Sequence, residues 1–234
     1  MFTSQPPIDD RCTGLSERPS PFIAQTTLSS NAFSRSPITA VGLSELDRAA
    51  LEEQLAIACA YAVIIDRIAA RHALMPSMVA GFCSRRSGWG LDLSPTGADG
   101  TRDLEARPCN LSSRQTPLPP DGLGYVRGLM GLDFDRHPLA REPQWRDPES
   151  NLDAAFSMIA GYRSRLRRVT TLQGTGLLRA SFTAFECGLE RVEHAIRQGQ
   201  DVDSPTPGWC QVAGRGCGQD VVARAAFFQA EGWD

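Results

Sequence analysis

The chain has 234 residues, a formal net charge of −3, and ordinary shares of hydrophobic (41%) and charged (22%) residues. This length allows one domain with a core that needs no disulfide to hold it. The acidic balance excludes a polycation that binds nucleic acid through phosphates alone, and 7% aromatic residues argue against a base-stacking platform. The longest apolar run, residues 55–65, is shorter than the ~20 residues that span a bilayer. We therefore expect neither nucleic acid nor a membrane as a partner.

Residues 1–43 are rich in Ser, Pro and Thr and carry little periodicity, which predicts an irregular N-terminal extension. A helix is expected after Ser44, where Asp47 completes a weak capping box. Apolar residues then recur at three- and four-residue steps to about Arg71, which predicts one amphipathic helix. The first twelve residues have neither the basic nor the apolar segment of a secretion signal.

The rest of the chain predicts further helices around one long irregular segment. Pro76 fits the first position of a helix that ends at Gly88. Residues 88–125 hold many Gly, Pro, Asp and Ser residues without a helical period, as functional loops often do. Asp147 marks another helix start. Three more helices are expected at residues 175–187, 189–198 and 219–231. The fold class predicted is α+β, mostly α, with a small β region near residues 121–135.

The cysteines do not form a known metal or redox pattern. No two have C-x-x-C spacing, so zinc and thioredoxin motifs are absent, and we expect no metal and no cofactor. Cys210 and Cys217 lie close together in a Gly-rich loop, where we expect free thiols rather than a disulfide. The seven cysteines are Cys12, Cys59, Cys83, Cys109, Cys187, Cys210 and Cys217.

Four segments carry a pattern when they are taken together. In chain order they are residues 76–88 (PSMVAGFCSRRSG), 121–137 (DGLGYVRGLMGLDFDRH), 184–196 (AFECGLERVEHAI) and 220–233 (DVVARAAFFQAEGW). The first three are similar to P-x-x-I-A-x-I-x-S-R-E-S, D-x-G-x-G-x-G-L-M-Q-x-D-x-x-x-H and A-Y-N-x-G-x-G-N-V-x-x-A-I. With the fourth, which matches a C-terminal helix, they resemble the goose-type lysozyme family over roughly residues 44–233.

The resemblance implies a lysozyme-like fold over residues 44–234, with a long insertion at residues 91–120. The family cleaves the β-1,4 bond between N-acetylmuramic acid and N-acetylglucosamine in peptidoglycan. This chemistry needs a protonated carboxylic acid at the glycosidic oxygen and carboxylates on the water side of the sugar. The resemblance also implies a monomeric, extracellular protein, whereas the N-terminal residues show no secretion signal, so a cytoplasmic protein stays an alternative.

The position of the family's catalytic glutamate is occupied by Arg86. Arginine keeps its proton at neutral pH and therefore cannot serve as the general acid, a loss of about 10²–10⁴ in rate. The family's glutamine, tyrosine and asparagine are likewise replaced, by Gly131, Phe185 and Glu186. Phe185 is a candidate to contact the sugar, and Arg86 is expected to bind an anionic group such as the lactyl carboxylate of muramic acid.

The water-side carboxylates of the family have candidates in this chain. Asp133 matches the aspartate after G-L-M, and Asp121 matches the earlier one with a single extra residue. Asp92 is a rival for that earlier position. His137 falls on a cleft histidine of the family, and Tyr125 is a further candidate to contact the substrate.

Three functions are compatible with these residues. The first is a catalytically impaired relative that binds a peptidoglycan or chitooligosaccharide glycan. The second is an active glycosidase with a substitute acid, for which Glu186 is the best candidate, and the third is a structural or partner-binding module. Each of these residues also has a purely structural interpretation. Arg86 can be a cation at a helix C-terminus, and Asp133 can be an ordinary strand residue. Glu186 can be an exposed residue at a helix end, which we prefer to a catalytic role.

Overall fold

The computed structural model describes residues 43–108 and 115–234. The predicted irregular extension therefore lies outside the described residues, apart from Leu43. The described residues form seven α-helices: α1 (Glu45–Cys59), α2 (Ala62–His72), α3 (Pro76–Ser87), α4 (Pro148–Val169), α5 (Gly174–Cys187), α6 (Leu189–Arg197) and α7 (Cys217–Ala230). Four 3₁₀ turns accompany them: η2 (Gly88–Gly90), η3 (Pro138–Arg141), η4 (Pro143–Arg146) and η5 (Gly208–Cys210).

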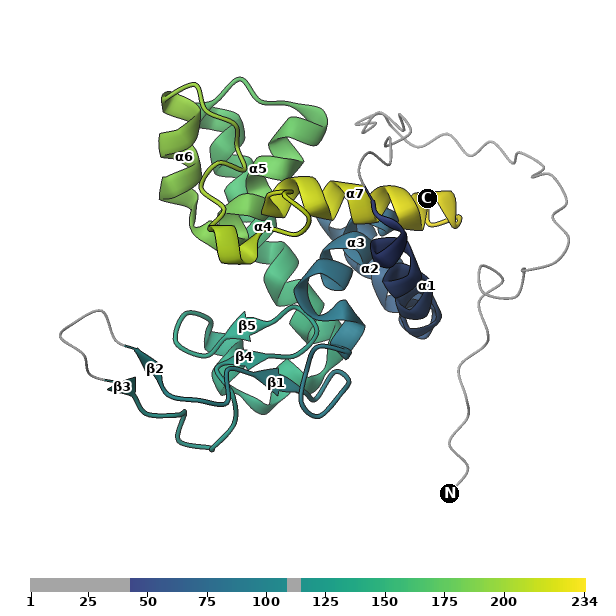
Figure 1. Ribbon diagram of the computed structural model, residues 1–234, viewed down its shortest axis with the longest axis vertical. Helices are drawn as coiled ribbons and strands as arrows, with labels where there is room; N and C mark the ends of the chain where they lie inside the picture. The colour runs from purple at the N-terminus through teal and green to yellow at the C-terminus, as the bar shows by residue number, and fades with distance from the viewer. Residues whose placement is uncertain (1–42, 109–114) are drawn as a thin grey trace, which may run out of the picture.

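The β structure is small and antiparallel. One sheet has the order β1-β4-β5, and a separate hairpin pairs β2 with β3. The strands are β1 (Thr101–Arg102), β2 (Arg107–Pro108), β3 (Gln115–Thr116), β4 (Val126–Arg127) and β5 (Leu132–Asp133). The prediction of an α+β, mostly α chain is confirmed. Figure 1 shows the sheet in the lower part of the view and α6 at the upper left, whereas α1, α2, α3 and α7 are grouped on the right.

Several helix ends that the capping residues predict are confirmed. Asp47 and Ser44 exchange both capping-box hydrogen bonds, at 3.0 and 3.1 Å. Gly88 ends α3 with a left-handed φ of 55°, and the Asp147 carboxylate accepts the Ser150 N–H at the start of α4. These ends could be predicted because each cap lies within a few residues of the groups that it satisfies.

Two predictions about the elements were wrong. The single helix expected from Ser44 to Arg71 is broken at Ala60 and Tyr61, and the backbone dihedral angles of Tyr61 are not helical. The Tyr61 ring stacks on the Trp89 ring, with centroids 5.5 Å apart. Apolar periodicity missed the break because both halves bury an apolar face. The β region also extends beyond residues 121–135, since β1, β2 and β3 lie earlier in the chain. Two-residue strands are too short to show an alternating pattern.

The core is built around α3, which is buried along almost its whole length. Phe82 of α3 contacts Phe156 of α4 and Phe182 of α5, with ring centroids 5.9 and 4.8 Å apart. On another side α3 lies very close to α7, since a Cβ at Gly81 would lie 2.6 Å from the Ala225 backbone nitrogen. No helix in the described part of the chain is long and apolar enough to cross a membrane.

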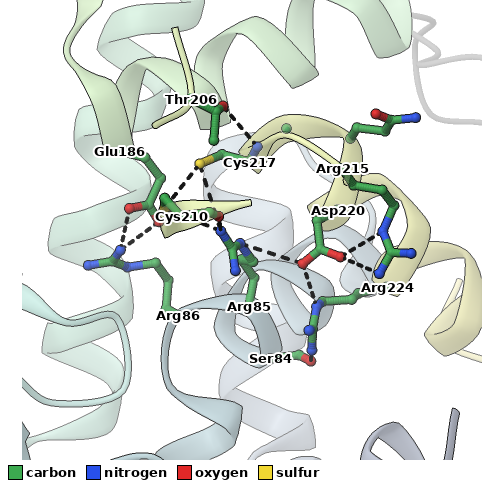
Figure 2. Close-up of polar contacts among 12 residues, drawn as sticks. Ser84, Arg85, Arg86, Glu186, Thr206, Cys210, Arg215, Cys217, Asp220 and Arg224 are labelled. Carbon is green, nitrogen blue, oxygen red and sulfur yellow. Dashed lines mark hydrogen bonds and ion pairs between the residues drawn. The ribbon is translucent and has the colours of Figure 1, made fainter. Parts of the chain in front are cut away.

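A buried carboxylate ties α3 and α7 together (Figure 2). Asp220 is fully buried, and it accepts hydrogen bonds from the Nε atoms of Arg215 and Arg224 at 3.0 and 2.8 Å. Arg85 of α3 adds an ion pair, with Nε 3.5 Å from the second carboxylate oxygen. Burial of an unpaired carboxylate costs several kcal/mol, so these three arginines are required for Asp220 to be buried.

The close approach of α3 and α7 predicts opposite effects for two Gly→Ala substitutions. Gly81→Ala should lower the free energy of unfolding by about 1–3 kcal/mol, because the new methyl group overpacks against the α7 backbone. The matched control is Gly161→Ala in α4, whose added Cβ meets no atom within 4 Å. It should raise the free energy of unfolding by up to ~1 kcal/mol through helix propensity. Urea denaturation measures both, and a Gly81→Ala variant as stable as the wild type would contradict this packing.

Candidate functional site

A cleft of about 440 Å³ lies where the C-terminal ends of α3 and α5 face the sheet. Five of the seven residues that the sequence proposed for the site line this cleft: Arg86, Asp133, His137, Phe185 and Glu186. Residues distant in sequence are therefore brought together by the packing of α3 against α5 and by the β4–β5 turn. This cleft brings these motif residues together, which makes it the candidate functional site.

At the floor of the cleft Arg86 forms an ion pair with Glu186 (Figure 2). The Arg86 Nη1 atom lies 2.5 Å from both carboxylate oxygens of Glu186, and the two side chains are only 15% and 11% exposed. Arg86 also donates from Nε to the Met130 carbonyl at 2.9 Å and from Nη2 to the Gly131 carbonyl at 2.8 Å. All three nitrogen atoms of its guanidinium thus donate hydrogen bonds within the protein.

The positions at which the chain departs from the lysozyme motifs form one cluster in space. A Cβ at Gly131 would lie 2.8 Å from the Arg86 Nη2 atom, so the absence of a side chain there makes room for the guanidinium. The φ of Gly131 is also +57°, which favours glycine. The Phe185 ring centroid lies 5.3 Å from the guanidinium carbon of Arg86, in range of a cation–π contact. Gly131, Phe185 and Glu186 therefore all contact Arg86.

Glu186 is not the exposed helix-end residue of the purely structural interpretation, which is wrong because the side chain is largely buried in the ion pair. Both of its oxygens accept N–H groups from the guanidinium. Both oxygens are thus directed at Arg86, so neither is placed to donate to the leaving group of a glycoside. The arrangement therefore disfavours Glu186 as a substitute general acid.

Asp133 lies on the cleft wall and is engaged by Arg107. Its Oδ2 atom accepts a hydrogen bond from Arg107 Nη1 at 2.7 Å, and its Oδ1 atom accepts the Asp135 N–H at 3.0 Å. Burial acts to lower the pKa of Arg107, but its hydrogen bonds to Asp133 and Asp103 outweigh this and raise the pKa. Asp133 is thus a fixed acceptor on the cleft wall.

Two of the proposed site residues lie outside the cleft. Asp121 accepts two hydrogen bonds of 2.7 Å from Arg127, whose side chain is 1% exposed, and these bonds lower the pKa of Asp121. Tyr125 is buried, and its hydroxyl donates to the carbonyls of Thr116 and Pro117. Both residues support the loops around the sheet. Asp92, the rival of Asp121, is exposed in a groove that adjoins the cleft.

His137 faces the cleft with a buried nitrogen. Within the described residues its Nδ1 atom has no hydrogen-bond partner, and burial lowers the pKa of the imidazole. The ring is therefore neutral at neutral pH and offers one donor and one acceptor. A neutral imidazole suits the hydroxyl and amide groups of a polar, uncharged part of a ligand.

Sequence motifs missed two further arginines that line the cleft, Arg102 and Arg136. Arg102 donates from Nη2 to the Arg86 carbonyl at 2.7 Å, and no ion pair joins either arginine to a carboxylate of the described residues. Burial and the nearby Arg86 charge lower the pKa of Arg102. Arg102 lies in the insertion, where no motif marks it, whereas Arg136 directly precedes His137 within the 121–137 motif segment.

No model of a known protein family and no curated protein sequence matches this chain. Across residues 43–108 and 115–234, no group of three or more His, Cys, Asp and Glu residues is arranged to hold a metal ion.

The Arg86–Glu186 pair predicts strong non-additivity in stability. Glu186→Leu alone should lower the free energy of unfolding by about 3 kcal/mol, because it leaves the Arg86 charge buried without its partner. Arg86→Leu should have a similar effect. The double variant should recover most of that loss, since both charges are then absent. A double-mutant cycle from urea denaturation measures the coupling energy, and additive single effects would contradict the pair.

Proposed function

We propose that this protein is a lysozyme-like glycan binder that uses the cleft of the goose-type lysozyme family without hydrolysing peptidoglycan. The single observation that carries the proposal is the Arg86–Glu186 ion pair at the position of the family's general acid. Glycoside hydrolysis needs a group that can give a proton to the leaving oxygen. Neither the guanidinium nor the carboxylate that accepts from it meets this need.

The charge of the cleft favours a glycan that carries carboxylates. Arg102 is half-buried and forms no ion pair with a carboxylate of the described residues, and Arg136 is an exposed residue of the same cleft lining. A desolvated guanidinium is costly until an anion pairs with it, so a ligand carboxylate at Arg102 offsets that cost. The lactyl carboxylate of N-acetylmuramic acid is such a group. Because Arg86 is engaged by Glu186, we assign this contact to Arg102 instead of Arg86.

The other two candidate functions have less support. An active glycosidase with Glu186 as its acid conflicts with the hydrogen bonds that this carboxylate accepts. A structural module without glycan affinity gives no role to Arg102 and Arg136, which form no ion pair within the described residues. Both remain outcomes of the experiments below.

Binding should be detectable where lysis is not. We expect the protein to sediment with insoluble peptidoglycan and to leave the turbidity of a peptidoglycan suspension unchanged. Muramyl-containing fragments should bind more tightly than uncharged chitooligosaccharides, and raising the salt concentration should weaken only the former, since ions screen a partly exposed charge pair. Arg102→Gln should weaken muramyl binding about tenfold, which corresponds to ~1.4 kcal/mol.

The matched control for Arg102→Gln is Arg168→Gln, which removes an exposed arginine of α4 outside the cleft. It should leave binding unchanged. An equal loss of affinity for muramyl-containing fragments in both variants would contradict the carboxylate contact. Tighter binding of the uncharged chitooligosaccharides than of the muramyl-containing fragments would contradict it as well. Absence of binding to either glycan would instead favour the structural module, and clearing of the suspension would favour the glycosidase.

Replacement of the guanidinium by an acid should restore slow hydrolysis. In Arg86→Glu the introduced carboxyl faces Glu186, and two adjacent carboxylates raise the pKa of one of them, which yields the protonated acid that the reaction needs. We expect measurable clearing of peptidoglycan by Arg86→Glu and none by Arg86→Gln, which removes the same charge without supplying an acid. Addition of Asp133→Asn should abolish the activity. A folded Arg86→Glu variant without lysis would show that the cleft lacks other parts of the machinery.

A further inference from the structure

A pair of thiols lies at the edge of the cleft, where η5 meets the start of α7. Cys210 and Cys217 are both free, and their sulfur atoms are 3.6 Å apart (Figure 2). A disulfide bond is about 2.05 Å long, so the two sulfur atoms need to approach by only about 1.5 Å to form one. A third free thiol, Cys187, at the end of α5, interacts with Cys217.

The two thiols of the pair differ in access. Cys210 is partly exposed and belongs to the lining of the cleft, whereas Cys217 is fully buried as the first residue of α7. A small solute therefore reaches Cys210 first. Cys217 is placed behind it, at hydrogen-bond distance, where either sulfur can act as the donor.

The surroundings of the pair favour a thiolate. Arg85 Nη2 lies 3.4 Å from the Cys210 sulfur and 3.8 Å from the Cys217 sulfur, and it also donates to the Cys210 carbonyl. The N-terminus of the 14-residue helix α7 adds positive potential at Cys217. Hydrogen bonds from the Cys187 and Cys210 thiols, together with the charge of Arg85, lower the pKa of Cys217. The same hydrogen bond raises the pKa of Cys210, so the pair shares one negative charge that is centred on Cys217.

We infer that Cys210 and Cys217 form a modification site that reacts with small-molecule disulfides and ends as an internal disulfide. In the first step Cys210 passes its proton to the Cys217 thiolate along their hydrogen bond, and the Cys210 sulfur attacks the disulfide RSSR, forms a Cys210–S–S–R bond and releases RS⁻. In the second step Cys217 loses this proton to the solvent, attacks the Cys210 sulfur and releases a second RS⁻. Two thiols are oxidised, one disulfide is reduced, and both released thiolates take up protons.

Glutathione disulfide is the probe for the test, and the sequence offers a direct readout. Trypsin cleaves after Arg215, between the two cysteines, so a Cys210–Cys217 disulfide joins the peptides 198–215 and 216–224. Cys187 lies in a third peptide, 180–191. After incubation of the full chain with glutathione disulfide, we expect mass spectrometry without reduction to find the 198–215 and 216–224 peptides linked and free of glutathione.

Two variants separate the steps. Cys217→Ser should stop at the first step and keep one glutathione on Cys210. Cys187→Ser is the matched control and should still form the linked peptides. The inference is overturned if the wild-type chain keeps glutathione on Cys210, if the linkage joins Cys187 to either partner, or if the three thiols remain unmodified. The wild-type map decides the outcome even where a variant fails to fold.

Discussion

The burial of the Asp220 carboxylate is the constraint on which the rest of the structure depends. Because it has no access to water, it requires the positive charges of Arg85, Arg215 and Arg224. Arg215 also pairs with Asp47 in α1, at 3.0 Å. The carboxylate thus links α7 to both α3 and α1, and it fixes the last turn of α3.

That last turn places one arginine at the edge of the cleft and the next arginine at its floor. Arg85 points to the Asp220 carboxylate and to the thiols of Cys210 and Cys217. The next residue, Arg86, points to the cleft floor and to Glu186. The proposed glycan site and the proposed thiol site therefore share one rigid support, which a close helix contact at Gly81 reinforces.

Arg86 at the cleft floor depends on three neighbouring residues. A guanidinium at position 86 needs space, which Gly131 provides, and a counter-charge, which Glu186 provides. The Phe185 ring covers the same group. As a set, these residues form a cationic floor whose charge and hydrogen bonds are satisfied within the protein, which is consistent with the proposed role in binding.

Sequence by itself determined the features that depend on near neighbours. The capping box at Ser44, the helix from Pro76 to Gly88 and the start of α4 at Asp147 each rest on groups a few residues apart. The sequence likewise identified Arg86 as a residue that cannot serve as a general acid, since that follows from the chemistry of the side chain alone. Five of seven proposed site residues also share the cleft.

Tertiary structure decided everything that depends on distant partners. Arg86 and Glu186 are 100 residues apart in sequence, so their pairing has no local signal. The two-residue strand β1 exists because β4 pairs with it, and Arg102 reaches the cleft from an insertion without a motif. Asp121 matched a motif, yet the fold pairs it with the buried Arg127 away from the cleft. Sequence pattern reports local geometry and side-chain chemistry, whereas burial and charge pairing are set by which distant segments pack together.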